Sequence, residues 1–336
     1  MVIKRPKFSI VITLLKINHY VRESIEHILK QTFQDFEIIV VSCQEETENF
    51  PKTRIINAGR LSPAMGRNLG VKESRGEIIA FIDDDAFPEK DWLEKTLHYF
   101  KDSEFSAVAG PGLMPPKSTF KQKLSGLVYE LSAGKTYYRY RKGKKQEVDD
   151  YPTCNLLVKK SDFLAAGGFA ERYWGGEDTQ FCHALTHVLN KKIIYDPSVV
   201  VYHHRRENIK GHLKQTYFWG MWRGFFSKIY PETSRKITYF VPSLFFLGVI
   251  FGGILSFFNP LIKNLYFGVL SLYFIYMLIL GLKTKSLVYY LPFIFLSIFT
   301  QFAYGLGFMK GFLFGEPIKR TLNPRSVKIK NEKIKN

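Results

Sequence analysis

Three consecutive aspartates follow an apolar run in FIDDDAF, residues 81–87. Like charges this close repel one another, and a packed fold gains nothing from them unless a cation or hydrogen-bond donors compensate the charge. Alternate side chains of an extended chain share a face, so we expect Asp83 and Asp85 to point the same way. Two hard oxygen donors, completed by phosphate oxygens, suit Mg²⁺ or Mn²⁺. The alternative is an acidic turn that caps a helix beginning near Pro88.

The elements that must position these carboxylates alternate between apolar runs and amphipathic stretches. Four runs are predicted strands: FSIVIT (8–13), FEIIVV (36–41), RIIN (54–57) and EIIAFI (77–82). Helical patterns lie between them, and this alternation predicts an α/β domain with a mostly parallel sheet. The near-continuous apolar strands predict a sheet covered on both faces. The aspartates then follow the fourth strand, at the edge where open α/β folds bind ligands.

The composition changes near residue 236. Three long apolar windows follow, at 237–258, 265–282 and 287–309, and none contains a charged residue. Each approaches the ~20 residues that a helix needs to cross a bilayer. A buried helix of a soluble core is the alternative for any one window, but three in succession predict a multi-pass membrane protein.

The net charge of +18 indicates an anionic partner, which could be nucleic acid, nucleotide phosphates or acidic lipid headgroups. Cations crowd the approach to the first window, interleaved with large aromatic residues: Arg205, Arg206, Lys210, Lys214, Arg223, Lys228, Arg235 and Lys236. This mixture predicts a segment in the headgroup layer of the membrane, with the preceding domain on the cytosolic side. A nucleic-acid binder would gather its cations on one face of a soluble domain, so we expect no nucleic-acid partner. Three scattered cysteines fit neither a disulfide framework nor a zinc site.

The C-terminal tail, from Lys310 to Lys335, is as basic as the approach to the first window, yet three crossings would place it outside the cell. Either one window is re-entrant or interfacial, with the Pro292-containing last window as the candidate, or the tail departs from the charge rule. The expected organisation is a cytosolic catalytic domain (1–205), a basic aromatic interfacial segment (206–236), transmembrane helices (237–310) and a basic tail (311–336).

Three blocks of the chain, in order and spacing, resemble the family 2 glycosyltransferases of GT-A fold: FSIVITLLKINHYVRESIEHILKQTFQDFEIIVV, SPAMGRNLGVKESRGEIIAFIDDDAFPEKDWLE and AAGGFAERYWGGEDTQFCHAL. KQTYFWGMWRG before the first apolar window and AYGLGFMKG in the last are similar to the subgroup of succinoglycan-type membrane glucosyltransferases. The resemblance implies an α/β domain of GT-A (nucleotide-diphospho-sugar transferase) type with a mostly parallel sheet, followed by an all-α transmembrane region.

The resemblance also implies which residues bind the donor. Asp83 and Asp85 would hold Mg²⁺ or Mn²⁺ against the diphosphate of a nucleotide sugar, with His203 as a third ligand, and the cation would neutralise the departing diphosphate. Arg67 would bind the same diphosphate through two guanidinium N–H groups. Asn155, in PTCNLLV, would line the sugar pocket.

On the acceptor side, GGEDTQ (175–180) corresponds to the motif whose second acidic residue removes the acceptor proton. Asp178 is therefore the expected general base, and Glu177 would hold the acceptor or orient the site. Acidic residues in the first turn of a helix are also favoured by the helix dipole alone. Trp174 would either stack on a sugar face or pack in the protein.

The chain departs from the family pattern in places. Acidic residues that read the nucleobase usually follow the second strand, whereas VVSCQEE leaves Glu45 as the donor-binding candidate there. Thr13 remains a donor-binding candidate although the usual Pro-Thr at the end of the first strand is missing. QTYFW (215–219) has Phe218 where processive synthases carry the arginine of Q-x-x-R-W, which argues against processive synthesis.

The function expected from the sequence is a metal-dependent inverting glycosyltransferase of the cell membrane. It would move a sugar from a cytosolic nucleotide-diphosphate sugar to a lipid-linked, polyprenyl-type acceptor in polysaccharide or glycan biosynthesis. A processive polysaccharide synthase is the first alternative. A non-catalytic scaffold of a glycan assembly complex is the second, and it would tolerate Asp83→Ala and Asp178→Ala.

Overall fold

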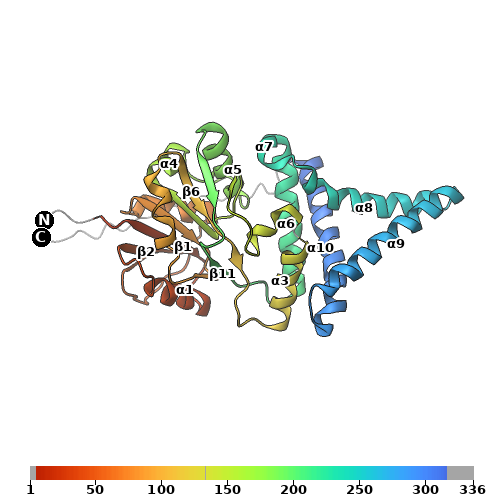
Figure 1. Ribbon diagram of the computed structural model, residues 1–336. Coiled ribbons are helices and arrows are strands. Elements are labelled where there is room, and N and C mark those ends of the chain that lie inside the picture. Colours follow the sequence, from red (N-terminus) through yellow and green to blue (C-terminus); the bar gives the residue numbers. More distant parts are fainter. Residues whose placement is uncertain (1–4, 133, 316–336) are drawn as a thin grey trace, which may run out of the picture.

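The structure is a computed structural model that describes residues 5–132 and 134–315. The N-terminal part is built on two sheets, and a helical part extends from it on one side (Figure 1). The strands of the described residues are β1 (Phe8–Leu14), β2 (Phe36–Ser42), β3 (Thr53–Asn57), β4 (Ile78–Ile82), β5 (Ala86–Pro88), β6 (Phe105–Ala109), β7 (Gly112–Leu113), β8 (Gln146–Val148), β9 (Asn155–Lys159), β10 (Lys192–Tyr195) and β11 (Val201–His203).

The α-helices of the described residues fall into two groups. Those of the sheet domain are α1 (His19–Leu29), α2 (Pro63–Glu73), α4 (Lys160–Ala165) and α5 (Glu177–His183). Those of the helical part are α3 (Phe120–Ser132), α6 (Ile209–Ile229), α7 (Pro231–Ser234), α8 (Ile237–Ser256), α9 (Pro260–Leu282) and α10 (Leu287–Phe314). The sequence did not predict that α3 belongs to the helical part, because α3 lies more than 70 residues before the other helices of this group.

The main sheet is mixed but mostly parallel, as predicted. Its strand order is β3-β2-β1-β4-β9-β6-β10-β8, and β8 and β9 run antiparallel to their neighbours. The order reverses beside β1, so the carboxyl ends of β1, β2 and β4 meet at one edge. A second, small sheet has the order β5-β11-β7 and lies after the aspartates of β4.

Both faces of the main sheet are covered, which confirms the prediction from its apolar strands. Side chains alternate along β1: Ile10 and Ile12 pack in one core with α1, while Val11 packs in the other with α2 and α5. Continuous apolar strands therefore supply two cores at once, and the sheet becomes a rigid base for the loops at its edge.

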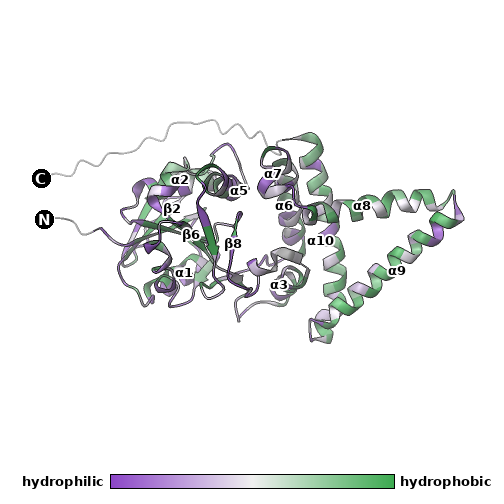
Figure 2. Cartoon of the chain, turned by 45° about the horizontal axis from the view of Figure 1, so that its top comes forward, coloured by the Kyte–Doolittle hydropathy of each residue, from purple (hydrophilic) through white to green (hydrophobic). Residues whose placement is uncertain are grey.

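The helices of the C-terminal part have two orientations. Helices α8 and α9 form a hairpin that projects away from the sheet domain, whereas α6 and α10 lie side by side across that direction (Figure 1). Helices α8 and α9 are apolar along almost their whole length, and α6 is mixed (Figure 2). All of α8, α9 and α10 are long and apolar enough to cross a membrane.

Small residues allow α6 and α10 to touch along their length. A Cβ atom on Gly220 or Gly224 of α6 would collide with the backbone of Tyr304 or Phe308. A side chain on Gly311 of α10 would likewise collide with α6. The last apolar window, which extends to Phe314 rather than 309, is thus bound along a helix that carries Arg and Lys. The expected basic tail lies outside the described residues from 316 onward.

Candidate active site

The acidic triplet follows β4, and the small sheet brings a histidine to it. Strand β11 pairs antiparallel with β5, which places His203 opposite Ala86, directly after the triplet. The His203 Nε2 atom lies 2.9 Å from Oδ1 of Asp85. Ligand atoms of Asp83, Asp85 and His203 all lie within 4.8 Å of one another. The three predicted metal ligands are therefore brought together, although 118 positions separate Asp85 from His203 in the sequence.

The charges of this cluster fit a cation. Burial raises the pKa of Asp84 to about 7, and the charges of Asp85 and Asp83 add to the shift. Burial also disfavours the charge of Asp85, but the charge and hydrogen bond of His203 outweigh it and lower the pKa of Asp85 to about 2. Burial opposes charge on His203 as well, yet Asp85 raises its pKa to about 10. The carboxylates of Asp83 and Asp85 offer oxygen donors that suit a divalent ion. His203 can act as a third ligand once its imidazolium releases a proton.

No helix begins at Pro88, so the alternative reading of the triplet as a helix cap does not apply. Residues 86–88 form β5, and only short 3₁₀ turns follow, at Glu94–Thr96 and Tyr99–Lys101. The triplet caps no α-helix in the described part of the chain, and its charge is met by side chains from distant segments.

Arg67 joins the acidic triplet to the second acidic motif. It lies in α2, which begins at a Ser62 cap whose Oγ accepts from the Met65 N–H, and Pro63 fills the first helical position. Its Nη2 donates to Oδ1 of Asp83 at 2.9 Å, and its Nη1 donates to Oε1 of Glu177 at 2.6 Å. The guanidinium therefore fixes the separation between the two carboxylate groups.

The second acidic motif is shaped by a glycine turn and by α6. Gly175 and Gly176 have φ angles of 153° and 72°, which residues with a side chain rarely adopt. A Cβ on Gly176 would collide with the Phe226 ring, and one on Gly175 would meet the Trp222 ring. Helix α6 thus packs directly on the turn that starts α5 and presents Asp178.

The environment of Asp178 raises its pKa toward neutral pH. Its Oδ1 accepts the Thr179 N–H at 2.8 Å, and its carboxylate faces the cavity. Burial, followed by the charges of Glu177 and Asp150, raises the pKa of Asp178 to about 7, and Arg223 partly offsets the shift. A pKa near the working pH is what proton removal from a hydroxyl requires.

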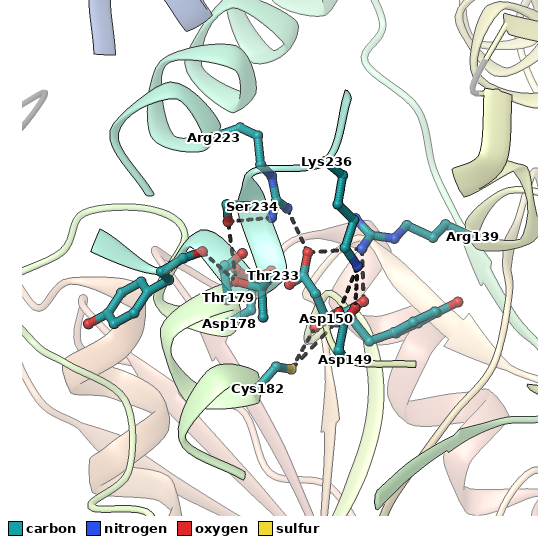
Figure 3. Close-up of polar contacts among 12 residues, drawn as sticks. Arg139, Asp149, Asp150, Asp178, Thr179, Cys182, Arg223, Thr233, Ser234 and Lys236 are labelled. Carbon is teal, nitrogen blue, oxygen red and sulfur yellow. Dashed lines mark hydrogen bonds and ion pairs between the residues drawn. The ribbon is translucent and has the colours of Figure 1, made fainter. Parts of the chain in front are cut away.

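A buried ion-pair network that the sequence analysis missed lies beside Asp178 (Figure 3). Asp150 is 3% exposed and accepts from Arg139 at 3.1 Å and from Arg223 at 2.7 Å. Burial would raise the pKa of Asp150, but the two arginines hold it well below its usual range. Since Arg223 belongs to α6, this network anchors the helical part to the sheet domain. The acidic pair in VDDY (148–151) was the available sequence signal.

One cavity of about 1000 Å³ connects these groups with the helical part. Its wall includes most of the predicted site residues: Thr13, Arg67, Asp83, Asp85, Trp174, Glu177, Asp178 and His203. It also includes residues of α3, α6, α8 and α10, among them Trp219, Pro242 and Tyr304. A substrate in this cavity would touch the sheet domain and the apolar helices at once.

Two predicted donor contacts lie elsewhere. Asn155 is fully buried, where its amide accepts from Trp92 Nε1 at 2.8 Å and donates to the Val199 carbonyl at 2.8 Å. It packs strands together and is not part of the cavity wall. Glu45 is exposed and also stands apart from that wall, whereas Cys43 contributes to it.

Comparison with known proteins finds a family match in the sheet domain. Residues 9–163 match the protein family described as "Glycosyl transferase family 2". The protein carries a family 2 glycosyltransferase domain. Long apolar helices follow the sheet domain that contains this match.

Two archaeal relatives extend well beyond the matched domain. A glucosyl-dolichyl phosphate glucuronosyltransferase of Haloferax volcanii is 20% identical over 73% of this chain and 85% of its own length. A dolichyl N-acetyl-α-D-glucosaminyl phosphate 3-β-D-2,3-diacetamido-2,3-dideoxy-β-D-glucuronosyltransferase of Methanococcus voltae is 22% identical over 64% of this chain and 72% of its own length.

The fold of the glycosyltransferase is shared by a solved structure. The mannosyltransferase PcManGT from Pyrobaculum calidifontis, in complex with GDP-Man and Mn²⁺, superposes with a TM-score of 0.55 at 15% sequence identity. The superposition covers 93% of this chain and 88% of the other. The GT-A fold predicted from the sequence is confirmed.

Proposed function

We propose that the enzyme transfers a sugar, with inversion, from a nucleotide-diphosphate sugar to a hydroxyl of a lipid-linked acceptor at the membrane surface. The observation that carries this proposal is the single cavity, whose wall holds the acidic cluster, Asp178 and the apolar helices together. The names of the two archaeal relatives, which act on dolichyl-phosphate-linked sugars, support a lipid-linked acceptor. The GDP-Man and Mn²⁺ bound by PcManGT support the donor class and the metal.

On the donor side, Asp83, Asp85 and His203 would hold Mg²⁺ or Mn²⁺, which when bound acts as a Lewis acid toward the diphosphate. Arg67 lies between Asp83 and Glu177, so its guanidinium can meet diphosphate oxygens while it keeps the two motifs in register. Thr13 and Cys43, at the ends of β1 and β2, lie on the cavity wall where the nucleoside would bind.

On the acceptor side, Asp178 removes the proton of the attacking hydroxyl. The acceptor oxygen forms a bond to the anomeric carbon, the bond from that carbon to the diphosphate oxygen breaks, and the proton stays on Asp178. This single displacement inverts the anomeric configuration. Glu177, tied to Arg67 at 2.6 Å, holds the start of α5 and so fixes the position of Asp178. Trp174 lines the same wall, where its ring can stack on a sugar.

Processive synthesis is disfavoured by the residues on the α6 side of the cavity. Gln215, Phe218 and Trp219 all line the wall, so the position that carries an arginine in processive synthases faces the substrate here as a neutral ring. A phenylalanine cannot provide the hydrogen bonds and charge of a guanidinium. We therefore favour transfer of one sugar per acceptor.

The packing of α10 suggests two membrane crossings instead of three. Helices α8 and α9 expose nearly all of their apolar surface, whereas α10 is bound along α6, which carries Lys210, Lys214 and Arg223 and cannot cross a bilayer cheaply. Both α6 and α10 lie across the direction in which α8 and α9 project (Figure 1). We therefore place α8 and α9 across the bilayer and α6 and α10 in the cytosolic interface. This arrangement returns the basic C-terminal tail to the cytosolic side, as the charge rule requires.

Single cysteines labelled in sealed vesicles test this topology, after replacement of the partly exposed Cys43. We expect Asn259→Cys, between α8 and α9, to react from outside the cell. Thr284→Cys, between α9 and α10, and Phe314→Cys, at the end of α10, should react only from the cytosolic side. Labelling of Phe314→Cys from outside would show that α10 crosses the membrane and would contradict the proposed arrangement.

The function is tested with membranes that contain the protein and a panel of nucleotide sugars, with and without a chelator. We expect one sugar to enter the lipid fraction only when a divalent ion is present, as a single addition to each acceptor. Ordered polymer would instead indicate a processive synthase. Glycan synthesis in cells that survives Asp83→Ala and Asp178→Ala would indicate a scaffold and would overturn the enzymatic proposal.

A further inference from the structure

Arg205 is a buried cation on the cavity wall that lacks a carboxylate partner. It is 7% exposed, and its Nε has no hydrogen-bond partner. Its Nη2 donates to the Gly112 carbonyl at 2.6 Å, and its Nη1 lies 3.3 Å from Nδ1 of His203. Within residues 5–132 and 134–315, no ion pair joins Arg205 to an acid. Burying an unpaired guanidinium is unfavourable, so the site is incomplete without an anion.

The other arginines of the cavity wall that are largely buried are already paired. Arg67 bridges Asp83 and Glu177, while Arg139 and Arg223 share Asp150. The charge of Arg205 helps to lower the pKa of Asp85, but that carboxylate is already paired with His203 and Arg206. It also acts on Glu130 of α3, and because burial raises the pKa of that carboxyl, Glu130 compensates Arg205 weakly. Arg205 therefore differs from the paired arginines in having charge available for a ligand.

Aromatic rings hold Arg205 in place without satisfying its N–H groups. The guanidinium lies over the rings of Tyr129 and Tyr140, at 5.8 and 5.3 Å from their centroids. Cation–π contact stabilises the charge through the flat face of the group and leaves its edge for hydrogen bonds. A guanidinium with a fixed orientation and an unpaired Nε–H can recognise phosphate oxygens.

The position of Arg205 is on the membrane side of the acidic cluster. The Tyr129 ring, which supports Arg205, stacks at 4.8 Å on His212 and packs at 5.3 Å on Trp219, both from the interfacial helix α6. Lys214 of the same helix is exposed and lines the cavity. Arg206 lines the same wall, where its side chain is half exposed and its Nη1 lies 3.6 Å from Oδ2 of Asp85. The three cations thus lie at the level where the headgroup of a lipid carrier would enter.

Building on the proposed function, we propose that Arg205, with Arg206 and Lys214, binds the phosphate of the acceptor lipid. A phosphate bound by these three cations would place the acceptor lipid between the sheet domain and α6. The sugar attached to that lipid would then extend along the cavity toward Asp178. The donor diphosphate would be met by a separate set of groups around Asp83, Asp85 and Arg67.

Binding of a lipid phosphate to the purified full-length protein in detergent tests this subsite. Geranylgeranyl phosphate is the probe, geranylgeraniol is the matched lipid without phosphate, and UDP or GDP with Mn²⁺ probes the donor side. We expect wild-type protein to bind the phosphate and not the alcohol. Arg205→Gln should weaken lipid-phosphate binding about tenfold or more, as loss of a charge-assisted phosphate contact predicts, and leave nucleotide binding intact.

Two lysines of α6 provide a matched pair. Lys210 and Lys214 are both exposed and lie one helical turn apart, but only Lys214 lines the cavity. Lys214→Gln should weaken binding of geranylgeranyl phosphate, whereas Lys210→Gln should leave it unchanged. If Arg205→Gln fails to fold, it should lose binding of both the nucleotide and the lipid phosphate. The two lysine variants then decide whether this wall of the cavity binds the lipid phosphate.

Three results would overturn the subsite. Wild-type protein could bind geranylgeraniol as well as its phosphate, Arg205→Gln could lose the nucleotide while keeping the lipid phosphate, or both lysine variants could behave like wild type. The second result would assign Arg205 to the donor diphosphate. Failure of the proposed function is separate, because it would appear as wild-type membranes that bind nucleotide and lipid phosphate yet transfer no sugar to the lipid fraction.

Discussion

Two clusters of carboxylates lie on one cavity, and they differ in how their charge is compensated. The first, Asp83 to Asp85, is open to the cavity and is met by His203, by Arg206 and by one edge of Arg67. The second, centred on Asp150, is sealed between Arg139 and Arg223 and is 3% exposed. The first has carboxylate oxygens on the cavity wall that can accept a ligand, while the carboxylate of Asp150 is engaged by two arginines.

This difference separates a ligand site from a structural joint. Both clusters are acidic and close to Asp178, so residue type alone does not distinguish them. The partners do, because a carboxylate satisfied by two arginines has no capacity left for a metal or a diphosphate. The first cluster should therefore control chemistry, and the second should control how firmly α6 is attached to the sheet domain.

The largest effect is expected from the open cluster. Asp83→Asn and Asp85→Asn should each lower sugar transfer about a thousandfold or more, since a bound divalent ion supplies several kcal/mol of charge stabilisation to the leaving diphosphate. The measurement is transfer rate against metal concentration. Glu26→Gln, on the solvent-exposed face of α1, is the control. Normal rates in both aspartate variants would show that the open cluster is not the metal site.

Asp178 should come next, with a loss of about 10² to 10⁴ in kcat for Asp178→Asn. The rate of wild-type enzyme should rise with pH through about 7 and then level off, because a base acts only when it has lost its proton and the pKa of Asp178 is raised to about 7. The groups around it that set this value are Glu177, Asp150 and Arg223. A pH profile that keeps this rise in Asp178→Asn would assign the base to another group.

The sealed cluster should affect stability. Asp150→Asn leaves Arg139 and Arg223 buried without a counter-charge, so the free energy of unfolding should fall by about 3–5 kcal/mol in denaturant titration. Replacing Arg223 by Met in the same chain should recover part of the loss. Because the charge of Asp150 helps to raise the pKa of Asp178, the pH rise of the remaining activity should also move to lower pH. Unchanged stability would mean that this network does not attach α6.

The smallest effect on stability is expected at Asp149, the neighbour of Asp150 in the sequence. Asp149 pairs with Lys236 at 2.7 Å, but the two side chains are 34% and 42% exposed. Asp149→Asn should therefore cost at most about 1 kcal/mol of unfolding free energy. A loss as large as that of Asp150→Asn would show that burial does not explain the difference between the neighbouring pairs.

The sequence predicted much of the fold and part of the site. The first four strands of the α/β domain, the acidic motifs and the three apolar windows are local patterns, so each was visible without knowledge of the rest. Asn155 illustrates the limit: the family resemblance suggested a sugar contact, but its amide bonds to Trp92 and Val199 away from the cavity wall. Asp150 illustrates the opposite case. The sequence analysis did not single it out, because its structural role depends on an ion pair with Arg223, 73 positions later.

The sequence by itself determined which groups are present and where the chain is apolar, because composition and local periodicity follow directly from residue order. Only the tertiary structure decided which of those groups meet. It decided that β11 delivers His203 to Asp85, that Arg67 reaches Glu177 across 110 positions, and that α10 packs along α6. The physical reason is that burial, charge compensation and close helix contact depend on atoms brought together from distant segments, and no local pattern encodes them.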